Sequence, residues 1–127
     1  MLPAAERLRK NHDFRVVFAQ GRSFGGPFFS LRVRQTPEVP TSRAFGFSLS
    51  RKVGKAVLRN RLKRQLRDIL RRLGPQLGFG FQLVCQVKPQ AAEASYAELR
   101  QAMMVQCQRA GLMQPVATEP VLPQNDV

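Results

Sequence analysis

The feature that most constrains this chain is one long, basic helical pattern, GKAVLRNRLKRQLRDILRRL, at residues 54–73. At about 100° per residue, five apolar positions of this pattern fall in one narrow stripe, which predicts a helix with one buried face. These positions are Leu58, Leu62, Leu66, Ile69 and Leu73. Gly74 and Pro75 follow directly and predict the end of the helix.

The opposite face of this helix is strongly basic. Residues 54–72 contain one acid, Asp68, and the basic residues Lys55, Arg59, Arg61, Lys63, Arg64, Arg67, Arg71 and Arg72. Ordinary solvent-exposed helix faces mix both signs, because like charges at i, i+4 destabilise a helix by roughly a few tenths of a kcal/mol per pair. The excess of one sign favours a polyanion as partner over a face that is merely solvated.

Asn60 falls near the centre of the basic arc, with Lys63 and Arg64 as its i+3 and i+4 neighbours. A carboxamide offers both a donor and an acceptor. Asn60 is therefore a candidate to contact a phosphate, to orient an arginine, or to accept from the water shell of a metal ion held by RNA. From the pattern alone, a surface residue without such a role explains it equally well.

The composition narrows the kind of polyanion. The 127 residues suggest one domain, and the net charge of +13 with a pI of about 11.5 is typical of a nucleic-acid-binding protein. A membrane surface fits less well, because residues 54–72 contain no aromatic residue to insert beside the basic face. No apolar run reaches the roughly 18 residues of a membrane span, and the N-terminus shows no signal-peptide core.

The two cysteines, Cys85 and Cys107, show no CxxC spacing. Both occupy apolar positions, which predicts reduced, buried thiols in a cytoplasmic protein rather than a disulfide or a metal site.

Alternating and helical patterns predict the remaining elements. Residues 11–20 read as a helix with Asn11 as N-cap and an apolar face of Phe14, Val17 and Phe18. Residues 27–34 and 43–50 alternate as two strands, for which an antiparallel hairpin is expected, and residues 79–89 read as a third strand.

The C-terminal part reads as a helix followed by a tail. At residues 95–111, Ser95 and Glu98 predict a capping box, and Gly111 predicts the end of the helix. The expected inner face consists of Tyr96, Leu99, Met103, Cys107 and Ala110. The resulting order, α-β-β-α-β-α, indicates one small α+β domain over residues 1–111, and the proline-rich residues 112–127 read as a disordered tail.

Two segments carry a resemblance to a known family. The stretches RLRKNHDFRVVFAQGRSF (7–24) and FGFSLSRKVGKAVLRNRLKRQLRD (45–68) resemble the bacterial ribonuclease P protein subunit. The RNR at residues 59–61, inside KVGKAV.RNR.KR..R, looks like the signature of that family, and the resemblance spans about residues 7–110. It implies a mixed sheet of the ribosomal protein S5 domain 2-like type with a left-handed β-α-β crossover, whereas the general rule predicts a right-handed one.

The resemblance also implies a function. The family's protein subunit is not itself the catalyst, and it pairs with a catalytic RNA that removes the 5′ leader from precursor tRNA. The implied partners are that RNA and the precursor tRNA with its leader, with no membrane and no small-molecule substrate. The implied cofactor is Mg²⁺, held mainly by the RNA subunit and the substrate.

Two groups of site residues follow from the resemblance. The positions that match the family's contacts to catalytic RNA are Lys52, Lys55, Arg59, Asn60, Arg61, Lys63, Arg64 and Arg67. The positions that match its leader-binding cleft are Arg7, Lys10, Asn11, Phe14, Phe18, Phe28, Ser30 and Arg32. Relatives often carry Arg where this chain has Gln86 or Val87, and Lys88 is the candidate substitute.

Other functions fit the sequence less well. A self-sufficient nuclease needs paired acids and bases or a metal cage, but the chain has one histidine, His12, and its carboxylates form no cluster at ligand spacing. A reader of duplex DNA would need a helix free of the core and usually a dimer, and nothing in the sequence indicates half-sites. A general structural RNA-binding protein, of ribosomal or chaperone type, is the alternative that composition leaves open.

Overall fold

The computed structural model describes residues 2 and 4–114. Its elements are α1 (Asn11–Gln20), β1 (Arg22–Phe24), β2 (Phe29–Gln35), β3 (Arg43–Leu49), α2 (Ala56–Leu73), β4 (Phe81–Val87) and α3 (Tyr96–Arg109). Short 3₁₀ turns lie between them: η1 (Ala4–Glu6), η2 (Arg51–Val53), η3 (Gly74–Gln76) and η4 (Pro89–Glu93). The small α+β domain and the order of its main elements are as predicted, and the short strand β1 is an addition.

The four strands form one mixed sheet in the order β1-β2-β4-β3. β4 pairs antiparallel with β2 and parallel with β3, so β4 separates the two strands that were expected to form a hairpin. That hairpin prediction is wrong, and the burial of β4 explains why. Leu83, Val84 and Cys85 are all fully buried, and a strand with apolar residues on both faces belongs in the interior of a sheet.

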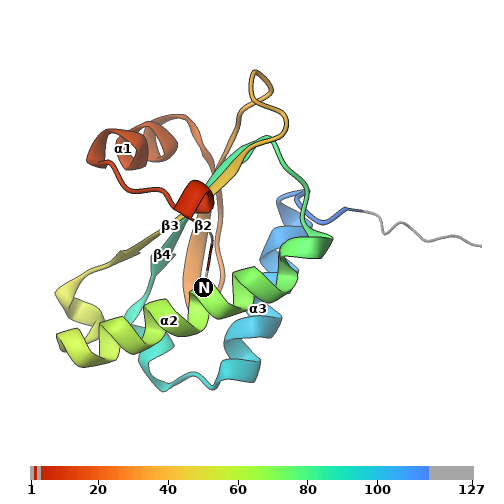
Figure 1. Cartoon of the computed structure of the whole chain (residues 1–127). Coiled ribbons are helices and arrows are strands. Elements are labelled where there is room, and N and C mark those ends of the chain that lie inside the picture. The colour runs from red at the N-terminus through yellow and green to blue at the C-terminus, as the bar shows by residue number, and fades with distance from the viewer. Residues whose placement is uncertain (1, 3, 115–127) are drawn as a thin grey trace, which may run out of the picture.

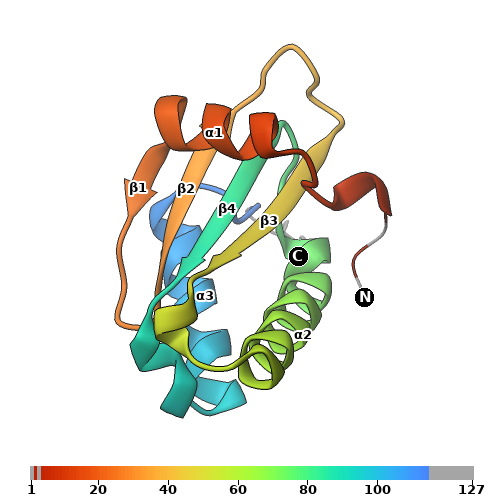
Figure 2. The ribbon, with the colours of Figure 1, turned by 90° about the vertical axis from the view of Figure 1, so that its left-hand side faces the viewer.

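The connection from β3 through α2 to β4 is left-handed. Figure 2 views the sheet from the side that α1 covers, and both parallel strands run downward. β3 lies to the right, α2 passes behind the sheet, and β4 lies to the left. This crossover runs against the general right-handed rule and agrees with the hand implied by the family resemblance.

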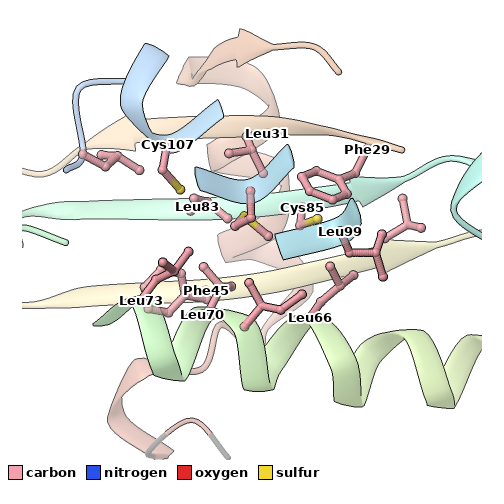
Figure 3. Packing of buried hydrophobic residues seen from close by; sticks show 14 of the residues in the cluster. Phe29, Leu31, Phe45, Leu66, Leu70, Leu73, Leu83, Cys85, Leu99 and Cys107 are labelled. Atoms are coloured by element: carbon pink, nitrogen blue, oxygen red, sulfur yellow. The ribbon is translucent and has the colours of Figure 1, made fainter. Parts of the chain in front are cut away.

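The main core lies between the sheet and the two helices α2 and α3 (Figures 1 and 3). The predicted stripe of α2 faces this core, with Leu62, Leu66, Ile69 and Leu73 fully buried and Leu58 partly buried. Figure 3 shows leucines of α2 directed at Phe45 and Leu83 of the sheet. Burying each such side chain stabilises the fold by about 1.5–3 kcal/mol before entropy is counted.

Both cysteines are buried and free, as predicted. Burial raises the pKa of the Cys107 thiol to about 12, and it raises that of Cys85 as well. Neither thiol is therefore a reactive nucleophile in the folded protein.

The opposite face of the sheet carries α1, with Leu8 of the preceding segment packed beside it (Figure 2). The predicted apolar face is confirmed: Val17 is fully buried with Val84 of β4, and Phe14 and Phe18 pack around them. The predicted N-cap is wrong, because Asn11 is the first helical residue and Lys10 holds the cap position without a side-chain hydrogen bond.

The C-terminal helix begins and ends as predicted. The Ser95–Glu98 capping box is present, with Glu98 N–H to Ser95 Oγ at 3.1 Å. After the helix, Leu112 is only 4% exposed, and Met113 bridges to Leu77. The predicted tail therefore starts too early at residue 112, because residues 112–114 pack back on the domain, and residues 115–127 lie outside the described part.

Candidate nucleic-acid interface

The geometry of η2 and Gly54 sets where the basic helix starts. Gly54 has φ of 149°, a backbone conformation that favours glycine, and an added Cβ would also require Cδ2 of Leu58, 2.5 Å away, to move. Ser50 accepts a hydrogen bond from the backbone of Lys52 in the turn before it. α2 then begins with no acid in its first turn, so its positive N-terminal end stays uncompensated beside Lys52 and Lys55.

The basic residues of α2 divide into two groups. At its C-terminal end, Asp68 binds Arg71 and Arg72, each at 2.9 Å, and accepts a 2.6 Å hydrogen bond from the Tyr96 hydroxyl of α3. These bonds, that of Tyr96 first, hold the pKa of Asp68 well below its ordinary value. This cluster joins two helices and is structural.

The second group forms no salt bridge with a described acid. Within the described part, the salt bridges join Arg43 to Glu6 and Asp68 to its two arginines. None of them involves the remaining basic residues of the helix and its N-cap, which are Lys55 at the N-cap and Arg59, Arg61, Lys63, Arg64 and Arg67 in the helix. We call these six residues the basic face. Asn60 is exposed among them, as the helical projection predicted.

The cleft side of α1 is built around two aromatic rings. Phe14 lies over Gly46 of β3 so closely that an added Cβ there would come within 2.6 Å of the Phe14 ring. Both Phe14 and Phe18 stay partly exposed at the rim of their cluster, so a ligand can reach part of each side chain. Gly46 is thus the floor that allows α1 to sit this close to the sheet.

Arg32 of β2 points into the same region and holds α1 to the sheet. Its Nη1 donates to the carbonyl of Phe18 at 3.0 Å, and its guanidinium carbon lies 5.4 Å from the centre of the Phe18 ring. Its Nε is buried without a described partner. Arg32 therefore fixes the position of Phe18 and saturates one of the free carbonyls at the end of α1.

A polar cavity of about 290 Å³ joins the two surfaces. From α2, Lys63 and Arg67 line it, and from α1, Phe14 lines it. The wall also contains Arg9 and Phe47, which sequence reasoning did not assign to either site, and Arg67 stacks over Phe47 at 5.8 Å. The remaining lining residues are Arg7, Leu8, Phe45 and Gly46.

The structure does not bring every predicted cleft residue together. Lys10 and Asn11 lie exposed at the start of α1, and Ser30 lies partly exposed on β2. Phe28 packs instead against the main core cluster and lines a groove beside α3, on the other side of the sheet from α1. Lys88, the candidate substitute on the last strand, donates to the carbonyl of Gly26 at 2.6 Å.

Two further observations limit the chemistry. In residues 2 and 4–114, no three His, Cys, Asp or Glu side chains gather in a way that could hold a metal ion. None of the helices in that same part of the chain is both long and apolar enough to cross a membrane.

Comparison with known proteins agrees with this architecture. A family model described as Ribonuclease P matches residues 2–111. The ribonuclease P protein component of Symbiobacterium thermophilum is 40% identical over 111 residues, which are 87% of this chain and 95% of that protein. Its counterpart in Pseudanabaena sp. is 43% identical over 100 residues, or 78% and 85% of the two chains.

Solved structures share the fold. The RNase P protein from Thermotoga maritima superposes with a TM-score of 0.74 at 29% identity, covering 82% of this chain and 96% of that one. The Staphylococcus aureus RNase P protein superposes with a TM-score of 0.79 at 23% identity, covering 87% and 99%.

Proposed function

The chain belongs to the ribonuclease P protein family, and from this premise we propose that it binds two RNAs on two adjoining surfaces. As a ribonuclease P protein component, it is part of an endoribonuclease holoenzyme that processes tRNA. The basic face of α2 binds the catalytic RNA. The cleft between α1 and the sheet binds the single-stranded 5′ leader of precursor tRNA, and the RNA subunit carries out the hydrolysis in the cytoplasm.

The observation that carries this proposal is the absence of acidic partners along the basic face. None of the six residues of the basic face forms a salt bridge with any described acid, although Asp68 of the same helix pairs with Arg71 and Arg72. Phosphates are the natural partners of such a surface, because each neutralised phosphate releases a condensed counterion and adds affinity. Asn60, exposed at the centre of the face, adds a donor and an acceptor that suit a phosphate or a ribose.

The aromatic rim of α1 supports the leader assignment. Single strands bind to proteins by stacking bases on aromatic rings beside a positive groove, and stacking accepts any base. Phe14 and Phe18 are the partly exposed aromatic rings of this cleft, and Arg9, Lys63 and Arg67 supply charge around the cavity that Phe14 lines. A leader in this cleft would run into the basic face, so the scissile end of the substrate would lie next to the catalytic RNA.

The chain's own donors do not fit direct binding of Mg²⁺. The ion needs several oxygen ligands, usually with carboxylates among them. The one oxygen donor considered for it, in Asn60, has Lys63 and Arg64 as helical neighbours, and these cations disfavour an inner-sphere ion. Mg²⁺, which supplies Lewis-acid chemistry, is therefore placed on the RNA and the substrate. Asn60 acts at most as an acceptor for a metal-bound water.

Reconstitution tests the proposal. The pure protein, its catalytic RNA, and both together are incubated with a 5′-leadered precursor tRNA at low Mg²⁺. Cleavage at the mature 5′ end is expected only when both components are present, because the protein's charge screens two polyanions that must approach each other.

The same assay distinguishes the proposed function from the alternative, a general RNA-binding role. If the protein failed to stimulate cleavage and bound unrelated RNAs with equal affinity, a general RNA-binding role would replace the one proposed. A Lys63→Ala/Arg67→Ala double variant tests both proposed surfaces at once, because both residues line the cavity that joins them. It should weaken binding of both the catalytic RNA and the leader.

A further inference from the structure

The outer side of α3 borders an apolar groove that the proposed RNA surfaces do not use. The groove has a volume of about 510 Å³ and lies between α3 and the loop at residues 25–28. Ala102 and Val105 line it from the helix, Phe28 lines it from the loop, and Val105 is 41% exposed. No residue of the basic face lines it.

The loop wall of the groove is held in place before any partner arrives. Two side chains donate to carbonyls of the loop, Arg109 to Gly25 at 2.7 Å and Lys88 to Gly26 at 2.6 Å. Gln106 donates to the two residues that flank the loop, Phe24 and Phe29, at 2.9 Å each. A surface fixed in this way loses little conformational freedom on binding. The groove is therefore pre-organised for a partner.

The charges at the two ends of the groove point to the partner. Glu98 and Arg109, both exposed, line it at opposite ends of α3. Eleven residues separate them, so they lie roughly 16 Å apart along the axis and within about 20° of each other around it. Ala102 and Val105 fall between them in the same narrow arc. One acid and one base flanking a small apolar centre do not suit a nucleic acid, but they complement a copy of themselves turned end for end.

We propose that this face of α3 is a two-fold homodimer interface whose partner is a second copy of the chain. In an antiparallel arrangement Glu98 of each copy faces Arg109 of the other, and both ion pairs form at once by symmetry. The same register sets Ala102 of one copy opposite Val105 of the other, so a larger side chain enters the space beside a small one. This inference does not depend on the proposed RNA binding.

The net charge of +13 opposes association in general, and the test must take this into account. Screening limits that repulsion to about 8 Å at physiological salt, and the opposing pairs at the interface lie within that distance. Sedimentation velocity of the full chain at about 0.15 M salt is therefore the measurement. The expected result is a reversible monomer–dimer equilibrium.

Charge exchange tests the antiparallel register. Glu98→Arg alone and Arg109→Glu alone each place like charges opposite each other, twice per dimer, and each should weaken self-association by about tenfold or more. An equimolar mixture of the two variants should associate again, because the introduced arginine of one then faces the introduced glutamate of the other. Loss of a local contact in the monomer cannot produce this recovery.

Two controls distinguish a loss of pairing at the interface from a change in net charge and from a loss of folding. Arg100→Glu changes the net charge as much as Arg109→Glu does, but Arg100 lies about 200° from Glu98 around the helix and should leave the dimer intact. Thermal unfolding of each variant checks the capping box to which Glu98 belongs. A wild-type chain that stays monomeric at every concentration would overturn the proposal. A mixture that stays monomeric while the wild type dimerises would overturn it too.

Discussion

The helices α2 and α3 pack on the same face of the sheet, yet their outer sides differ completely. Inward, both present fully buried apolar residues, such as Leu66 on α2 and Leu99 on α3. Outward, α2 presents six cations without acidic partners, whereas α3 mixes Glu98 with two arginines and exposes Val105. The inner stripe of each helix therefore determines how the domain holds together, and the outer side determines what it binds.

The largest expected effect is a loss of stability, and it tests the inner faces of α2 and α3, which pack in the same core. Leu66→Ala and Leu99→Ala should each lower the free energy of unfolding by about 2–5 kcal/mol, because each leaves a cavity in the same core. Urea titration followed by circular dichroism measures both. Val57→Ala, at a residue 82% exposed on α2, is the control and should change it by less than about 0.5 kcal/mol. If the two variants lost very different amounts of unfolding free energy, the inner faces of α2 and α3 would not contribute equally to the core.

The helix α1 adds a third case, because it lies on the other face of the sheet from α2 and α3. Phe18→Ala should reduce affinity for leadered precursor tRNA by about 1–3 kcal/mol and spare mature tRNA, since it removes one stacking platform. Fluorescence titration of the holoenzyme with both substrates measures this.

Phe28→Ala is the matched control for α1, because Phe28 lies beside α3 rather than beside α1. It should leave the affinity for leader unchanged. Equal losses for leadered and mature tRNA in Phe18→Ala would contradict the cleft assignment.

Substituting one exposed arginine on each helix, Arg61 on α2 and Arg100 on α3, compares the outer sides of the two helices. Arg61→Ala should weaken binding of the catalytic RNA and reduce the slope of log K against log salt by about one, because one phosphate contact is lost. Arg100→Ala on α3 removes the same charge and should leave the slope as it was. Binding isotherms at several salt concentrations measure both. Equal slopes for Arg61→Ala and the wild type would exclude that contact.

Local pattern was enough to predict the helices and most strands. The stripe of α2 and the capping box of α3 depend on neighbours in the sequence, and both were found as expected. The strand pairing was not, because the alternation of β2 and β3 says which face is buried but not which strand lies between them. The double burial of β4, visible in the run of Leu83, Val84 and Cys85, was the signal that could have placed it at the centre.

In the candidate site, too, local pattern predicted some residues, and the others depend on the tertiary fold. Helical geometry placed Lys63 and Arg67 on one exposed arc of α2 before the fold was known. Arg9 and Phe47 escaped notice because only the crossing of an extended segment and a strand brings them to the joining cavity. The resemblance assigned Phe28 to the cleft with Ser30 and Arg32, but Phe28 lies before β2 begins, where the alternation of the strand no longer holds.

The smallest expected effect concerns Asp68 of α2, whose carboxylate accepts a hydrogen bond from Tyr96 of α3. Because the pKa of Asp68 is lowered in the folded state by Tyr96, Arg71 and Arg72, its ionised form is stabilised there. Its contribution is therefore fully present above the ordinary pKa of about 3.9 and is lost as pH falls below it. The difference in unfolding free energy between the wild type and Asp68→Asn should be constant near neutral pH and narrow below about pH 4. Tyr96→Phe removes the foremost donor to Asp68, so in that background the unfolding free energy should depend less on pH below about pH 4. If the difference in unfolding free energy between the wild type and Asp68→Asn did not change with pH, a role for the charge of Asp68 in joining the helices would be refuted.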